Sequence, residues 1–235
     1  MSIFIHTNNG RRLSLDNPSP ADISMPEIAS ALGRICRYNG QVDFHYSVAE
    51  HCLLLSQAME LEGCEPIVAL GALLHDAAEA YTGDISAPIA ALLGRGPQTD
   101  RLRDLTAKLE VCIVELTGLP LTPPRTVGPP SITPQRQPTP AGQRLLGCIR
   151  GAEGVHLADL RILLHEREAL LHPFDQDATD NRLRWGWGID FEFPEVTPLP
   201  GPPSIVGLDA YGASAHWYHR YRKLLARVQS GAEAA

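Results

Sequence analysis

The sequence is poor in lysine and in positive charge. Of its 20 basic residues, only Lys108 and Lys223 are lysines, and 27 acidic residues give a formal net charge of −7. Such a chain has no general attraction for a phosphate backbone, which argues against a broad surface for duplex nucleic acid. A small anionic ligand in a local pocket remains compatible with this charge balance, because arginine suits bidentate contacts to phosphate.

Long apolar runs are absent as well. No run approaches the roughly 20 apolar residues that a membrane-spanning helix needs, so we expect no membrane segment. The opening residues, MSIFIHTNNGRRLSLDNP, lack the charged region and the following apolar region of a signal peptide. These absences predict a cytoplasmic protein.

The cysteines follow no pairing pattern. Their number is odd, and no two are spaced as in a Cys-x-x-Cys motif. This argues against a disulfide framework and against a thiolate zinc site. We interpret all five as reduced and most of them as buried, small apolar side chains: Cys36, Cys52, Cys64, Cys112 and Cys148.

Glycine and proline, in contrast, are abundant, with 20 of each in 235 residues. Globular proteins ordinarily contain about 12% of the two together. Eight prolines fall between Pro120 and Pro140, where they exclude a helix interior or a central strand. A second loop-rich stretch runs from Pro194 to Pro203. We therefore predict one domain over 1–235, with Pro-rich loop insertions at about 119–142 and 194–206.

Apolar residues recur at helical spacing along the rest of the chain. Ser47-Val48-Ala49-Glu50 forms a capping box, in which each polar side chain accepts a hydrogen bond from the other residue's backbone N–H. Turn signals in the first twenty residues favour an irregular or hairpin-like entry, but no stretch predicts a strand of useful length. The predicted class is all-α, with helices at about 24–39, 47–61, from 66 to a break at 83–84, 99–116, 155–170 and 210–228.

The candidate chemistry centres on His75 and Asp76, two polar residues at the end of an apolar helical stretch. His51 lies one predicted helix upstream, and Asp159 lies in an apolar helical stretch far downstream. Two imidazoles and two carboxylates from packed helices are a ligand set for one divalent cation inside a bundle. Because unpaired buried carboxylates are costly, a shared metal explains all four residues together. The set suits Zn, Co, Mn, Fe or Ni, and we expect Zn, Co or Mn first.

Three segments carry a resemblance to a known family: YSVAEHC (46–52), ALLHDAAEAYTGDISAPI (72–89) and LADLRILLHERE (157–168). In this order they resemble the HD-domain phosphohydrolases. They are most similar to the branch that contains bacterial deoxyribonucleoside 5'-nucleotidases and phage dATP triphosphohydrolases. The likeness covers roughly 18–118 and 154–171, outside the Pro-rich insertions. It implies an HD-domain helical bundle that acts on a small deoxynucleotide, and we expect a homo-oligomer.

The resemblance assigns roles to acidic residues. It makes the same four residues the metal ligands: His51, His75, Asp76 and Asp159. Glu79 corresponds to the acid/base carboxylate of the family, and Asp84 matches a second acidic position. Glu79 also follows His75 by four residues, so on a continuing helix the two side chains share a face. Such a carboxylate is suited to orienting a water or moving its proton.

Substrate-binding roles also come from the resemblance. Arg37 corresponds to an arginine that contacts the phosphate or sugar of the substrate, with Arg34 as the alternative. Tyr38 falls where the family often has an aromatic residue beside the base. Pro88 matches a proline that lines the nucleotide pocket.

Some polar positions receive other interpretations. Ala90 stands where relatives often carry a lysine, so Arg95 or a second ion such as Mg is expected to balance the phosphate charge. His165-Glu166 is interpreted as a pair that supports a metal centre from outside or packs between helices.

The leading hypothesis is a metal-dependent hydrolase that converts a dNTP, by resemblance dATP, into deoxynucleoside and triphosphate. The first alternative is a 5'-deoxynucleotidase that releases phosphate from dNMPs. A non-catalytic nucleotide-sensing module stays open, and so does a diiron oxygenase of the same fold, in which His45 and His156 are conceivable extra ligands.

Overall fold

The computed structural model describes residues 3–94, 96–119, 121–122, 137–138, 140–185, 187, 189–190, 193, 195–198 and 204–233. Helices dominate these residues, which confirms the predicted all-α class. None of the described helices is both long and apolar enough to cross a bilayer. The α-helices are α1 (Met25–Leu32), α2 (Val48–Leu61), α3 (Pro66–Leu74), α4 (Glu79–Thr82), α5 (Ala87–Leu93), α6 (Pro97–Leu116), α7 (Pro140–Ile149), α8 (Val155–Leu170), α9 (Asn181–Arg184) and α11 (Ala210–Glu233).

The described strands are short and form two antiparallel pairs. β1 (Phe4–His6) pairs with β2 (Arg12–Ser14), with Ile5 opposite Leu13, which confirms the predicted hairpin-like entry. β3 (Leu121–Thr122) pairs with β4 (Gln137–Pro138).

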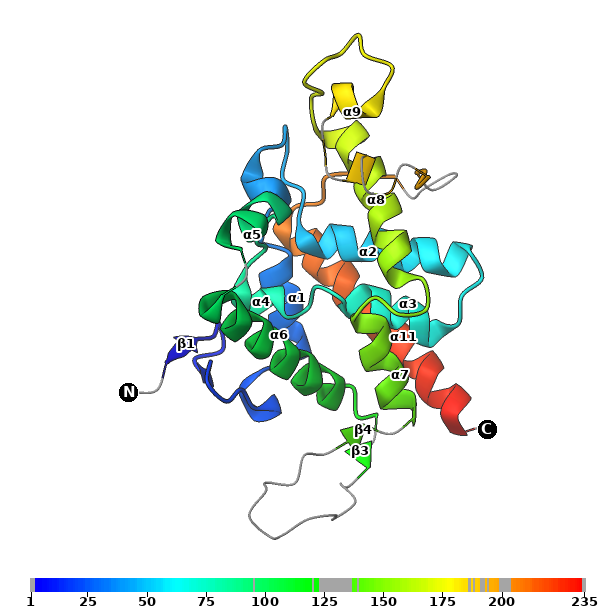
Figure 1. Ribbon diagram of the computed structural model, residues 1–235. Coiled ribbons are helices and arrows are strands. Elements are labelled where there is room, and N and C mark those ends of the chain that lie inside the picture. The colour runs from blue at the N-terminus through cyan, green and yellow to red at the C-terminus, as the bar shows by residue number, and fades with distance from the viewer. Residues whose placement is uncertain are drawn as a thin grey trace.

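The helices surround a central group made of α2, α3 and α11. In Figure 1, α8 runs upward from this group, α1, α4 and α6 lie to its left, and α7 lies below, where it contacts α6 and α3. Contacts link α2 with α3, α11 and α8, and link α3 with α7 and α11. The last helix of the chain therefore closes the core that the first helices begin.

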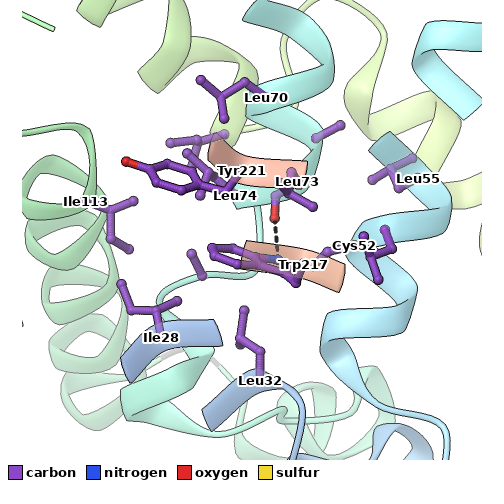
Figure 2. Packing of buried hydrophobic residues seen from close by; sticks show 14 of the residues in the cluster. Ile28, Leu32, Cys52, Leu55, Leu70, Leu73, Leu74, Ile113, Trp217 and Tyr221 are labelled. Carbon is purple, nitrogen blue, oxygen red and sulfur yellow. Dashed lines mark hydrogen bonds between the residues drawn. The ribbon is translucent and has the colours of Figure 1, made fainter. Parts of the chain in front are cut away.

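The core is aliphatic and tightly packed around Trp217 (Figure 2). Trp217 is fully buried, and its indole Nε1 donates a hydrogen bond to the Leu73 carbonyl at 3.2 Å. Gly71 lets α3 approach α7, because a Cβ at this position would lie 2.2 Å from the Cβ of Cys148. The end of α3, where the candidate site begins, is thus held rigidly from two sides.

The first predicted helix ends earlier than its pattern indicates. α1 stops at Leu32, whereas the prediction continued to about residue 39. After this helix the chain becomes extended. The backbones of Cys36 and Ser47 form an isolated antiparallel β-bridge, and the Val48 backbone N–H donates to the Ile35 carbonyl. A 3-10 helix, η2 (Arg37–Gly40), follows, and its Tyr38 and Asn39 adopt left-handed backbone conformations with φ of 56° and 53°. Apolar spacing cannot distinguish this short bridge from one more helical turn.

The capping box is realised only in part. Ser47 Oγ accepts a hydrogen bond from the Glu50 N–H at 3.2 Å, as predicted. Glu50, however, turns its buried carboxylate to the backbone N–H groups of Val206, Gly207 and Leu208, at 2.9, 3.0 and 2.9 Å. This carboxylate fastens the segment before α11 to the start of α2.

The Pro-rich insertions fall largely outside the described residues. Of the insertion predicted at 119–142, the structure describes 119, the paired residues 121–122 and 137–138, and 140–142. α7 begins at Pro140, so the predicted boundary overlaps the start of this helix. Of the insertion predicted at 194–206, residues 195–198 and 204–206 are described, and they form neither helix nor strand. All five cysteines are free thiols, and Cys52, Cys112 and Cys148 are buried, as predicted.

Candidate metal centre

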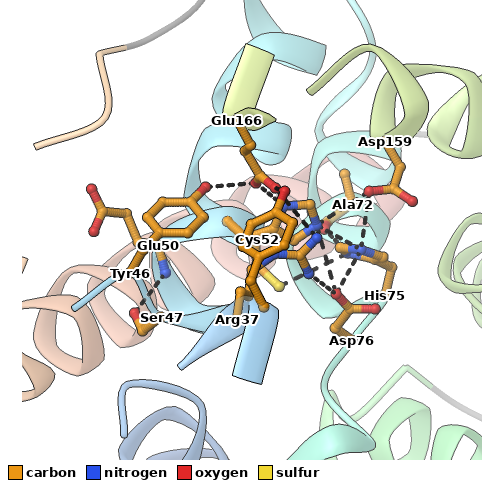
Figure 3. A network of polar contacts seen from close by, with 12 residues as sticks. Arg37, Tyr46, Ser47, Glu50, Cys52, Ala72, His75, Asp76, Asp159 and Glu166 are labelled. Atoms are coloured by element: carbon orange, nitrogen blue, oxygen red, sulfur yellow. Dashed lines mark hydrogen bonds and ion pairs between the residues drawn. The ribbon is translucent and has the colours of Figure 1, made fainter. Parts of the chain in front are cut away.

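The four predicted ligands come together at the junction of α2, α3 and α8. His51 lies in the first turn of α2, His75 and Asp76 directly follow α3, and Asp159 lies in α8. The two Nε2 atoms of His51 and His75 are 3.3 Å apart. Figure 3 shows His75 between Asp159 and Asp76, whose oxygens lie 3.9 and 3.0 Å from its Nε2. His51 Nε2 lies 3.2 Å from Asp159 and 3.6 Å from Asp76.

These separations, from 3.0 to 3.9 Å, are close to those between ligands of a single cation. Nitrogen and oxygen ligands about 2.0–2.2 Å from a tetrahedral zinc lie roughly 3.3–3.6 Å from one another. In the described part of the chain, His51, His75 and Asp159 offer ligand atoms within 4.8 Å of each other, and so do Cys52, His75 and Asp76. The donor set of imidazoles and carboxylates therefore suits a divalent transition metal.

Cys52 is a poor candidate ligand. Its thiol is fully buried, and burial raises its pKa to about 11. The nitrogen of His75 nearest to it is Nδ1, at 3.9 Å, and this nitrogen lies 2.8 Å from the Ala72 carbonyl, to which it donates. The Nε2 atoms and the two aspartates define the centre.

The electrostatics of the cluster require positive charge. Burial alone would lower the pKa of His75, but Asp76 outweighs it and raises this pKa well above the ordinary value. Burial would likewise raise the pKa of Asp159, but its hydrogen bond to His51 and the positive charge there hold this pKa well below the ordinary value. Protons on the imidazoles thus occupy the position that a bound cation would take, and metal and protons compete for the same atoms.

The histidines are oriented by hydrogen bonds on the far side of their rings. His51 Nδ1 lies 2.5 Å from Glu166 Oε1, and His75 Nδ1 lies 2.8 Å from the Ala72 carbonyl. Such partners hold the proton on Nδ1 and leave Nε2 free to bind a metal. Glu166 was not among the predicted site residues. The signal that identifies it is its position seven residues after Asp159, which places both side chains on one face of α8 after two turns.

Glu79 reaches the neighbourhood of the centre by a route other than the predicted continuous helix. After Leu74 the chain tightens, because Ala77 donates to Leu74 and Glu79 donates to Asp76 through bonds that span three residues. Glu79 therefore starts the separate short helix α4. Its Oε2 is buried and has no hydrogen-bond partner among the described residues.

The carboxyl of Glu79 is protonated in the absence of a cation. Burial and the nearby charges of Asp76 and Asp84 raise its pKa to about 9. Asp84, which follows α4, is partly buried, and burial raises its pKa as well. Both predicted acidic residues are thus electrostatically coupled to Asp76.

Arg37 is brought to the centre, whereas Arg34 is not. The guanidinium of Arg37 lies 3.6 Å from Asp76 and 3.3 Å from Glu166, and its buried Nε has no hydrogen-bond partner in the described structure. Arg34 is exposed and donates to the Ser30 carbonyl of its own turn at 2.7 Å. Tyr38 donates its hydroxyl to Glu166 Oε2 at 2.7 Å.

The remaining predicted positions lie farther out or elsewhere. Pro88 and Ala90 are exposed on α5, and Arg95 lies outside the described residues. His45 contacts the Gly33 carbonyl at 3.0 Å and His156 is exposed. Neither histidine belongs to a metal-binding group in the part of the chain that is described.

A cavity of about 550 Å³ is lined by the other face of α8 and by residues 180–182, 189–190, 193 and 196–198, and it does not include the cluster. The buried guanidinium of Arg167 lines it, but two hydrogen bonds to Asp190, at 2.8 and 2.9 Å, engage that group. The cavity therefore presents an ion pair made through Arg167 Nη1, while Arg167 Nε is buried and has no hydrogen-bond partner among the described residues. The candidate ligands gather on the opposite face of the helix.

Comparisons with known proteins give relatives but no activity. No family model matches the sequence. The chain is similar to the uncharacterized protein YfdR of Escherichia coli, with 39% identity over 117 residues, and to an uncharacterized protein of Rhodobacter capsulatus, with 45% identity over 92 residues. These matches cover 50% and 37% of this chain. The chain spans only 60% and 47% of the length of these relatives.

Proposed function

We propose that the protein is a metal-dependent phosphohydrolase of deoxyribonucleotides, related to the HD-domain enzymes that its motifs resemble. The observation that carries this proposal is the convergence of His51, His75, Asp76 and Asp159, whose donor atoms lie 3.0–3.9 Å apart where measured. Arg37 and the carboxyl of Glu79 lie beside these ligands, and phosphoester hydrolysis uses one group that binds phosphate and one that transfers protons.

The four ligands would hold a divalent cation, and Zn, Co or Mn fit the donor set best. When bound, such a cation supplies a Lewis acid for a phosphoryl oxygen and lowers the pKa of water toward neutrality. A second ion such as Mg would balance the charge of a longer phosphate chain, because Ala90 offers no cationic group there.

The chain's own residues bind phosphate and move protons. Arg37 donates charge-assisted hydrogen bonds to phosphate oxygens from its guanidinium, which lies 3.6 Å from Asp76 at the edge of the cluster. Glu79 is the proposed group that exchanges a proton with the attacking water or with the departing 5'-oxygen, because it lies in the electrostatic reach of Asp76 and carries an ionisable carboxyl. Tyr38 and Pro88 are the proposed contacts of the nucleoside.

Two substrates share this chemistry. In the triphosphohydrolase form, water attacks the α-phosphorus of a dNTP such as dATP, the bond to the 5'-oxygen breaks, and deoxynucleoside and triphosphate leave. In the 5'-deoxynucleotidase form, the same attack on a dNMP releases phosphate. We favour the first because the segment from Arg34 to His51 resembles phage members of the family. The proposed setting is a cytoplasmic homo-oligomer.

A product assay tests the proposal. The protein is loaded separately with Zn, Co or Mn, with and without added Mg, and incubated with dATP, dGTP, dAMP and dGMP. Triphosphate from a dNTP supports the first form, and orthophosphate from a dNMP supports the second. Asp76→Ala, purified identically, controls for contaminating phosphatases. No product with any metal would refute the hydrolase and leave the nucleotide-sensing module.

A further inference from the structure

We propose that Glu166 is a positioning residue that couples the metal-binding face of the centre to its phosphate-binding face. The inference rests on the proposed function for the meaning of those two faces. The contacts behind it do not depend on that function: one buried carboxylate on α8 contacts the candidate ligand His51 through one oxygen and Arg37 through the other.

Glu166 is completely buried, and each of its oxygens has two partners. Oε1 lies 2.5 Å from His51 Nδ1 and accepts a hydrogen bond from the Tyr46 hydroxyl at 2.6 Å. Oε2 accepts from the Tyr38 hydroxyl at 2.7 Å and lies 3.3 Å from Arg37. Figure 3 shows Glu166 reaching from α8 toward Tyr46 and Arg37. All four partners belong to the stretch from η2 to the first turn of α2.

The contact at Oε1 determines how His51 meets a cation. A carboxylate that accepts from Nδ1–H fixes the tautomer and the plane of the imidazole, so that Nε2 is the ligating nitrogen. Tyr46 donates to the same oxygen and keeps that oxygen from turning away. Two side chains of α8 therefore contact the ring of His51: Glu166 contacts Nδ1, and Asp159 lies 3.2 Å from Nε2.

The contact at Oε2 determines where Arg37 points. Tyr38 and Asn39 hold left-handed backbone conformations, which side-chain-bearing residues rarely adopt without support. The hydrogen bond from Tyr38 to Glu166 supplies that support and turns the preceding Arg37 toward Asp76. A change at Glu166 should therefore disturb the arginine as well as the histidine.

Two other buried carboxylates show that this arrangement is particular to Glu166. Glu50 accepts hydrogen bonds from the backbone N–H groups of residues 206–208, and in Figure 3 it points away from the cluster. Asp190 pairs with Arg167, the neighbour of Glu166 on α8. These two fasten chain segments together, whereas three of the four partners of Glu166 are predicted site residues.

The test compares Glu166→Gln with Asp190→Asn. Both remove the charge of a buried carboxylate that contacts an arginine, and only the first touches the centre. Zn and Co affinity is measured by competition with a chromogenic chelator, and binding of inorganic phosphate to the metal-loaded protein is measured by calorimetry. We expect Glu166→Gln to weaken metal binding about 10–100-fold and to weaken phosphate binding as well. Asp190→Asn should leave both within about twofold of the wild type, as expected for a group outside the centre. Wild-type metal affinity in Glu166→Gln would overturn the inference.

A second measurement needs no substitution at Glu166. In the zinc-loaded wild type with ¹⁵N-labelled histidine, we expect His51 to bind zinc through Nε2 and to show a slowly exchanging Nδ1 proton far downfield. Tyr46→Phe should shift this proton, because it removes the other donor to Oε1. Coordination through Nδ1 would overturn the inference. Neither measurement depends on turnover. If the wild type hydrolyses no nucleotide but Glu166→Gln still weakens metal binding, only the proposed function is refuted.

Discussion

His51 Nε2 lies 3.2 Å from Asp159 Oδ1, although the two residues belong to helices far apart in the sequence. The other nitrogen of the same ring meets Glu166, seven residues after Asp159. One imidazole of α2 is therefore enclosed by two carboxylates that lie two turns apart on α8. Glu166 orients the ring through Nδ1, and Nε2 is left as a metal-binding atom beside Asp159.

Asp159→Asn should remove much of the metal affinity. The amide contributes no negative charge, so we expect a loss on the order of 100-fold, as for other strong perturbations of a metal centre. In the wild type, metal at 100 times its Kd should add about 2.7 kcal/mol to the free energy of unfolding. Asp100→Asn, a change at an exposed carboxylate of α6, is the matched control. Thermal unfolding with and without metal measures both variants, and equal metal-induced shifts would exclude Asp159 as a ligand.

Glu79→Gln should keep the metal and lose turnover. The amide cannot exchange a proton as the carboxyl can, and general acid–base catalysis contributes roughly 10²–10⁴-fold in rate. We expect kcat for the preferred deoxynucleotide to fall by that range while KM changes little. Metal content is measured on the same preparation. An unchanged kcat would remove Glu79 from the mechanism.

The same carboxyl predicts a pH dependence of stability in the metal-free protein. Burial and its acidic neighbours raise the pKa of Glu79 from 4.5 to about 9, so between these values the folded chain binds a proton that the unfolded chain has released. This contribution to stability is complete below about pH 4.5 and is lost as pH rises toward 9. Glu79→Gln should therefore lose stability less steeply than the wild type between pH 5 and pH 9. Urea unfolding in the presence of a chelator measures the difference, and parallel curves would contradict the raised pKa.

The sequence predicted the helices and the ligand cluster because both follow local rules. Ser47 marks the start of α2, and polar residues at the end of an apolar helix mark His75 and Asp76. Asp159 stood out for the same reason, as a carboxylate within an apolar stretch. We expected these polar residues to converge when the helices pack, because buried charges need partners.

Other features depend on tertiary contacts that no local pattern contains. The end of α1 is set by the bridge between Cys36 and Ser47. Glu50 leaves its predicted capping bond because three backbone donors of residues 206–208 compete for it. Glu166 is interpreted from the sequence as a residue that supports or packs. Its three hydrogen-bond partners and its ion pair with Arg37 form only when α8 lies against η2 and α2.

Gly71→Ala should destabilise the fold that carries the centre. A Cβ at this position would lie 2.2 Å from the Cβ of Cys148, so α3 and α7 would have to separate. Such overpacking costs about 1–3 kcal/mol. Gly231→Ala is the matched control, because its Cβ would meet no atom within 4 Å and alanine favours a helix. Urea denaturation compares the two, and equal stabilities would show that the two helices separate without cost.

Arg37→Lys should weaken phosphate binding while the metal stays bound. Lysine keeps the charge but lacks the planar fork of donors, and a charge-assisted hydrogen bond contributes about 1.5–3 kcal/mol. We therefore expect the KM of the deoxynucleotide and the inhibition constant of inorganic phosphate to rise about 10–100-fold. Arg34→Lys controls for a general loss of arginine, because Arg34 is exposed and bonds only within its own turn in the described structure. Equal effects of the two substitutions would mean that the centre recruits phosphate through a group other than Arg37.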